Sequence, residues 1–186
     1  MTGGAADRQR GAILGIRPAE DMADRQGGEG VPEPASGRPP LMLGGGAPRV
    51  LGLAGREADI VSLNFDNRSG ALGPAGISSS TAELTKQKIG WIREGAGDRF
   101  DELELEIGAY FTIVTDDRAT TLERMAPMFG LTADEFGVHP HGLVGSVDSI
   151  CDQLQERRET YGISYVTFGA TVLDAIGPVV DRLAGT

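Results

Sequence analysis

The chain has 186 residues, a formal net charge of −10 and a single cysteine. This length allows one sizeable hydrophobic core, and the acidic balance argues against a nucleic-acid partner, because a protein that binds phosphates needs clustered lysine and arginine. No apolar run is long enough to span a bilayer, no secretory signal is recognised at the N-terminus, and one cysteine excludes an internal disulfide. The composition therefore favours a cytoplasmic protein without a membrane or nucleic-acid partner.

Residues 1–38 differ in composition from the rest of the chain. They contain no aromatic residue and are rich in glycine and proline. Such a segment buries too little apolar surface to offset the entropy lost on ordering. We therefore predict a disordered leader at 1–38 and a folded domain at 39–186.

The folded part begins with a predicted strand at 41–43 that runs into Gly44, Gly45 and Gly46. A helix follows, with Ala47 before it and Pro48 at its first position, where proline is favoured. Glycines allow positive φ and a close approach to a ligand, and the free N–H groups of a helix start favour an anion. The segment is either a phosphate cradle or a plain tight turn. Arg49 either contacts the phosphate or faces solvent.

Strands and helices alternate through the rest of the domain. Parallel strands buried on both faces are nearly continuous apolar runs, and half-buried strands alternate apolar with polar residues. Helices start at capping residues and end at glycine. On these rules we expect strands at 59–64, 103–113 and 163–168, and helices at 48–58, from Ser80 to Ile92, from Asp116 to Met128, from Ser146 to Gly162 and at 172–183.

Further details of the expected helices come from single residues. Ser80 with Glu83, and Thr132 with Glu135, have the spacing of a capping box. Gly95 and Gly97 are expected to stop the helix that starts at Ser80. The loop at 65–79 is rich in glycine and serine and is expected to be irregular.

Several polar residues are candidates for chemistry. Asn64 ends a strand, where catalytic groups lie in parallel α/β barrels, or it simply begins a turn. His139 and His141 have too few companion ligands for a metal site, so packing in a loop or at the surface is favoured. Thr115, Asp116 and Asp117 are better explained as helix caps than as site residues.

Other candidates have a structural explanation that we favour. Glu102, Glu104 and Glu106 share one strand face, which is costly beneath a helix layer, so part of this strand is expected to extend past the helices. Catalytic carboxylates are the weaker alternative. Cys151 is expected to be a small buried apolar residue. Tyr165 and Phe168 either flank a flat ring or pack in the core, and packing is favoured.

Four βα units in series predict a parallel sheet covered by helices. A closed (β/α)₈ barrel needs eight such units and about 250 residues. Residues 41–186 therefore form either an open α/β sheet or the second half of a barrel.

Two stretches resemble the luciferase-like monooxygenase superfamily, in particular its branch of coenzyme F420-dependent oxidoreductases. The first is PPLMLGGGAPR at 39–49, running into LAGREADIV at 53–61. The second is LVGSVD at 143–148 with YGISYVT at 161–167. The resemblance covers residues 39–186 and implies the C-terminal half of a TIM-like (β/α)₈ barrel.

The resemblance also implies a function. Members of the family move hydride between a deazaflavin (F420) or FMN and a small organic substrate, and some are monooxygenases. The family's glycine loop lies against the phosphate arm of the cofactor, which corresponds here to Gly44, Gly45 and Gly46, then Ala47, Pro48 and Arg49, with Asn64 on the next strand. The family's earlier strands, which hold most of the ring pocket and the usual proton donor, have no counterpart in 1–38.

Two classes of function therefore remain open. The chain is an F420- or FMN-dependent oxidoreductase, or it is a non-catalytic half-barrel that needs a complementing N-terminal half or a second copy of itself. No catalytic residue is assigned, and no metal is expected. A third alternative, an unrelated nucleotide-binding domain with Asp66 on the ribose, fits poorly, because three adjacent glycines do not match G-x-G-x-x-G.

Overall fold

A computed structural model describes residues 39–66 and 73–185. The predicted leader at 1–38 and part of the loop at 65–79 lie outside the described residues. We describe the compact unit Pro40–Arg182 by itself. None of the described helices has the length and apolar character needed to cross a membrane.

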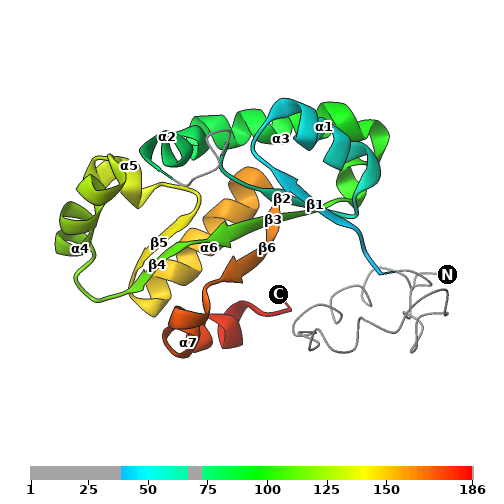
Figure 1. Cartoon of the computed structure of the whole chain (residues 1–186). Helices are drawn as coiled ribbons and strands as arrows, with labels where there is room; N and C mark the ends of the chain where they lie inside the picture. Colours follow the sequence, from blue (N-terminus) through cyan, green and yellow to red (C-terminus); the bar gives the residue numbers. More distant parts are fainter. Residues whose placement is uncertain (1–38, 67–72, 186) are drawn as a thin grey trace, which may run out of the picture. The chain divides into compact units, whose positions relative to one another are not determined.

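A four-stranded parallel sheet has the order β1-β2-β3-β6 (Figure 1). Its strands are β1 (Met42–Gly45), β2 (Ile60–Leu63), β3 (Glu104–Ala109) and β6 (Ile163–Phe168). The order follows the chain, as it does in successive βα units of a barrel. The prediction of a parallel α/β fold with four βα units is confirmed by this order and register.

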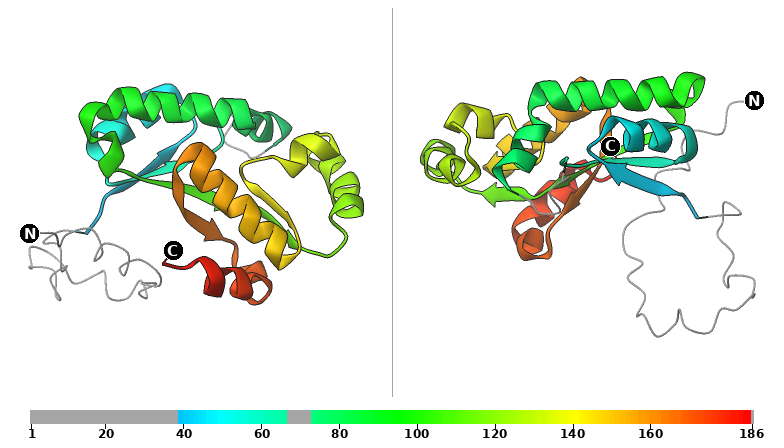
Figure 2. Two further views of the ribbon diagram at one scale, coloured as in Figure 1. Left: turned by 180° about the vertical axis from the view of Figure 1, so that it is seen from behind. Right: turned by 45° about the horizontal axis from the view of Figure 1, so that its top comes forward.

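Three helices cover one face of this sheet: α1 (Pro48–Glu57), α3 (Ala82–Ala96) and α6 (Val147–Tyr161). Figure 2 shows α6 from behind, crossing near β6. The core beneath them is made of aliphatic side chains from the helices and from alternate positions of β2 and β3. Its fully buried members include Leu51, Ala54, Val61, Ile92 and Ile107. Val50 and Leu53, which the sequence assigned to the apolar side of α1, are exposed instead.

Glycines bring α1 and α3 into close contact. A Cβ on Gly55 or Gly95 would overlap the backbone of the opposite helix. Gly95 therefore lies inside α3 and does not stop it, contrary to the prediction. The helix ends one residue later, at Ala96, and Gly97 follows with φ 56°, a conformation that favours glycine.

A second, two-stranded parallel sheet contains β4 (Phe111–Val114) and β5 (Gly142–Gly145). It is flanked by α4 (Arg118–Met125) and α5 (Ala133–Gly137), and its core includes Leu122, Phe136 and Val144. The single strand predicted at 103–113 is thus two strands separated at Tyr110. The strand β5 was not predicted, because four residues with two glycines give no alternation to detect.

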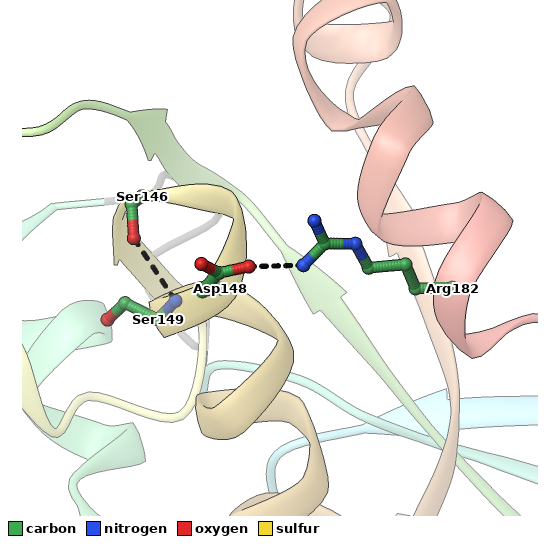
Figure 3. A network of polar contacts seen from close by, with 4 residues as sticks. All are labelled: Ser146, Asp148, Ser149 and Arg182. Carbon is green, nitrogen blue, oxygen red and sulfur yellow. Dashed lines mark hydrogen bonds and ion pairs between the residues drawn. The ribbon is translucent and has the colours of Figure 1, made fainter.

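The remaining elements are short, apart from the last helix. They are α2 (Pro74–Ile77), the 3₁₀ turns η2 (Ser78–Ser80), η3 (Gly97–Glu102), η4 (Ala126–Phe129) and η5 (Ala170–Val172), and the helix α7 (Leu173–Leu183). The capping box of Thr132 and Glu135 is present as predicted. Ser146 caps α6, and Asp148 in the first turn of α6 pairs with Arg182 of α7 (Figure 3).

Candidate functional site

The three glycines at the carboxyl end of β1 are used for close approach rather than for positive φ. Gly44 and Gly45 close the strand, and none of the three is among the described glycines with positive φ. A Cβ on Gly44 would lie 2.9 Å from Ser62 Cβ and from Asn64 Nδ2, and one on Gly46 would overlap the backbone at Phe65. The space that these glycines leave is thus filled by the end of β2, which corrects the physical reason given from the sequence.

The start of α1 agrees with the prediction. Pro48 occupies the first helical position, and Ala47 precedes it without a capping side chain. No acidic residue lies in the first turn, and Arg49 there is exposed. Within the described residues Arg49 forms no hydrogen bond or ion pair. The N–H groups of this turn are therefore not satisfied by a capping side chain, and the nearest charge is positive.

Asn64 connects three elements. Its side-chain Oδ1 accepts a hydrogen bond from the Tyr110 hydroxyl at 2.8 Å, and its Nδ2 donates to Ser62 Oγ at 3.0 Å. Its backbone N–H donates to the Gly45 carbonyl at 2.9 Å, and its own carbonyl accepts from Lys88 Nζ at 2.7 Å. The structure thus brings Asn64 together with the glycine segment, as the sequence predicted, and adds Tyr110 and Lys88, which the sequence did not single out.

Lys88 reaches Asn64 from the inside of α3. Its side chain is only 3% exposed, and Nζ also donates to Ser80 Oγ at 2.6 Å. Burial lowers the pKa of this amine to about 8, and the nearby Asp66 carboxylate opposes the shift. Because Ser80 is engaged by Lys88, the cap of α3 is Thr81, which accepts from the Leu84 N–H; the predicted capping box at Ser80 is wrong.

Tyr110 lies between the two sheets and is 53% exposed. Its ring folds back over Gly108, where a Cβ would collide with it, and stacks on the His141 ring at 5.3 Å with an interplanar angle of 15°. Phe65 lies 5.6 Å away on the same side. Burial and the Glu106 carboxylate raise the pKa of the Tyr110 hydroxyl, so it remains a hydrogen-bond donor at neutral pH. The only signal in the sequence is the glycine two residues earlier in the strand.

His139 and His141 are buried in the loop before β5. The predicted packing in a loop is confirmed, and the alternative of a surface position is wrong. His141 Nδ1 lies 2.8 Å from the Gly108 carbonyl, and His139 Nδ1 accepts from the His141 N–H. Burial lowers both pKa values, that of His141 to about 3, so both rings are neutral. Within the part of the chain that the structure describes, no group of three His, Cys, Asp or Glu side chains could hold a metal.

The face of the sheet opposite the helices is polar, and we call it the inner face. Leu105 and Ile107 face the helices, so Glu106 between them faces the other way. Glu106 is 3% exposed and accepts a hydrogen bond from Thr167 Oγ1 at 2.8 Å. Glu102 and Glu104 are exposed near the amino end of the strand, as predicted; Glu106 lies well within the sheet, which was not predicted.

The other candidates have structural roles. Asp117 caps α4 by accepting from the Thr120 N–H, and Thr115 accepts from the Asp117 N–H. These contacts confirm the helix-cap prediction. Cys151 is buried on α6, also as predicted. Tyr165 and Phe168 are half-buried on β6.

The sequence matches no protein-family profile and no curated protein. Three solved structures are similar to the chain. They are a coenzyme F420-dependent tetrahydromethanopterin reductase from Methanopyrus kandleri (16% identity, 78% of this chain, 50% of that chain, TM-score 0.49), the long-chain alkane monooxygenase LadA (17%, 79%, 40%, 0.46), and the riboflavin lyase RcaE with modified FMN and riboflavin (14%, 81%, 48%, 0.44).

These neighbours are luciferase-like enzymes, the superfamily that the sequence resembles. This chain spans about half the length of each: 50%, 40% and 48%. The likenesses are distant, and the parallel α/β fold is established by the strand order and register of the chain itself.

Proposed function

We propose that this chain contributes to an oxidoreductase that transfers hydride between a deazaflavin, F420, or alternatively FMN, and a small organic substrate. The observation that supports this function is the convergence of Gly46, Asn64 and Tyr110 at the carboxyl ends of three adjacent parallel strands. In parallel α/β folds this edge of the sheet is where ligands bind.

The residues at this edge fit a flavin-like cofactor. Its phosphate arm would meet the first turn of α1, where the N–H groups lack a capping side chain and Arg49 supplies a positive charge. Its flat ring would lie towards Tyr110, whose exposed aromatic surface suits stacking. The cofactor supplies the hydride chemistry; the chain's own residues bind and orient it.

A fluorescence titration tests this assignment. We expect saturable binding of F420, or of FMN, by the purified full chain. Arg49→Ala is expected to weaken binding about tenfold through loss of a charge-assisted hydrogen bond. Arg56→Ala is the matched control, because Arg56 is also an exposed arginine of α1 but lies in its last turn.

Gly45→Val is a second probe of the site. A Cβ there would lie 2.7 Å from Val50 Cγ1, the side chain of an exposed residue that can move aside. The substitution therefore crowds the start of α1 without filling the core. Absence of saturable binding, or equal binding by the Gly45→Val and Arg49→Ala variants and the original chain, would remove the basis for the assignment.

A second candidate function is a non-catalytic half-barrel that associates with a complementing N-terminal half or with a second copy. The strands β1 and β6 each pair on one side only within the described residues, which leaves two sheet edges available for pairing. Sedimentation velocity of the chain, alone and at increasing concentration, tests self-association. A monomer at all concentrations that still binds F420 would contradict this candidate.

We also propose a cytoplasmic location, supported by the single cysteine, which is buried and unpaired. Cell fractionation with an antibody to the chain tests it. Recovery in the membrane or secreted fraction would overturn this proposal.

A further inference from the structure

Glu106 is a buried acid on the inner face whose charge no described side chain compensates. It forms no ion pair with any lysine or arginine in residues 39–66 and 73–185, and its single hydrogen bond there comes from Thr167. A carboxylate has about four acceptor sites and is costly to bury without partners. Most of the hydrogen-bonding capacity of Glu106 is therefore unused.

The residues around Glu106 are small. In the register of the sheet it lies beside Ser62 on β2, and Ser62 in turn lies beside Gly44 on β1. Gly108, two residues further along β3, faces the same way and has no side chain. The sheet thus leaves room in front of the carboxyl group on the side that leads to β1.

This room is continuous with the edge of the sheet where the cofactor is proposed to bind. Ser62, beside Glu106, accepts the hydrogen bond from Asn64, and Asn64 accepts from Tyr110. A ligand that lies along the inner face from Asn64 towards β6 would meet Glu106 and Thr167 next. Since Thr167 already donates one hydrogen bond to the carboxyl group, the chemistry that fits the remaining capacity is a cationic N–H donor.

We propose that Glu106, held by Thr167, binds a cationic nitrogen group of the substrate, an ammonium or a guanidinium. This proposal rests on the proposed function for the role of the ligand as substrate, but the cation site itself is a property of the chain. An amine-bearing or guanidine-bearing substrate would therefore be selected over a neutral one at this position of the inner face.

Methylguanidinium chloride is the probe that tests the site, because its planar N–H pair matches a carboxylate. The readouts on the full chain are the ¹³C resonances of labelled Glu carboxyl groups and the amide resonances of Gly108 and Thr167. We expect saturable shifts at Glu106, Gly108 and Thr167. Tetramethylammonium, a cation without N–H donors, should produce none of these shifts at the same ionic strength.

Two variants complete the experiment. Glu106→Gln keeps the size of the side chain and removes its charge, and we expect it to weaken methylguanidinium binding about tenfold or more, read from the Thr167 amide. Glu104→Gln removes an exposed carboxyl group two residues earlier on the same strand and should leave binding unchanged.

Several results would overturn the proposal. They are no shift with methylguanidinium, equal shifts with tetramethylammonium, or equal binding by the Glu106→Gln and Glu104→Gln variants. Failure of F420 and FMN to bind, with the methylguanidinium response intact, would instead reject the proposed cofactor and keep the cation site. The two inferences therefore fail independently.

Discussion

The four-stranded sheet and the β4–β5 pair are both parallel, yet their side chains serve different ends. The first sheet is apolar towards α1 and α3 and polar on its inner face, where Ser62 and Glu106 lie side by side. The second is packed with aromatic and aliphatic side chains around Phe136, and its two histidines are buried and neutral. Figure 1 shows that β3 leads directly into β4, so Tyr110 marks the change from one kind of surface to the other.

This difference separates supporting residues from binding residues. Buried histidines attract attention in a sequence, but here both rings hydrogen-bond to backbone groups and hold the start of β5 against β3. The inner face instead has short side chains, exposed aromatic surface and unused hydrogen-bonding capacity. We infer that the β4–β5 region stabilises the site and that the four-stranded sheet forms it.

The largest expected effect breaks the second region. Phe136 is 1% exposed and packs against Phe111 and Phe129. Phe136→Ala should lower the free energy of unfolding by about 3–5 kcal/mol, because it removes a buried aromatic ring and leaves a cavity. Urea denaturation followed by circular dichroism measures the change. The exposed neighbour Val138, changed to Ala, is the control; equal losses in the two variants would contradict this packing.

The next effect concerns the buried amine beneath the first sheet. Lys88 is deprotonated more easily in the folded state, with a pKa of about 8 against 10.5 in the unfolded chain. The folded state therefore binds fewer protons in this interval, and stability should rise as the pH increases from about 8 to 10.5. Lys88→Met should remove this rise.

Urea denaturation at closely spaced pH values, for the original chain and the Lys88→Met variant, measures the contribution of Lys88. Asp66, His139 and His141 are the titratable groups that interact with it, and all three remain in the variant. A rise of the same size in both proteins would assign the pH dependence to another group.

The third prediction concerns the helix start beside Lys88. Thr81→Ala should lower the free energy of unfolding by about 1 kcal/mol, since Thr81 and not Ser80 caps α3. Circular dichroism at increasing temperature measures it, and the loss should not depend on pH. Ser80→Ala, by contrast, should change stability together with the pKa of Lys88, because it removes a hydrogen bond from the amine. If Ser80→Ala had no effect on the pH dependence, the assignment of the two residues would be wrong.

The smallest effect is expected on the surface. Arg182 and Asp148 join α7 to the first turn of α6, as Figure 3 shows, but both side chains are largely exposed. Exposed ion pairs contribute little, because water and salt screen them. Arg182→Ala should therefore leave the thermal midpoint unchanged within error, whereas a clear loss would show that this contact holds α7 in place.

Local signals predicted most of the secondary structure. Pro48, Thr132, Ser146 and Gly162 mark helix ends in the structure as they do in the sequence, because capping depends on residues only a few positions apart. The predictions failed where a distant partner decides the outcome. Lys88 takes Ser80 away from the start of α3, and Gly95 continues the helix because it packs on Gly52.

The sequence by itself determined the order of four βα units and the position of the glycine segment, because apolar periodicity and helix caps are encoded locally. Only the tertiary structure decided what the glycines are for and which residues gather near them. Gly44 and Gly46 make room for the end of β2, and Asn64, Glu106 and Tyr110 come together through strand register across 46 residues. Register depends on contacts between distant parts of the chain, and no local pattern contains it.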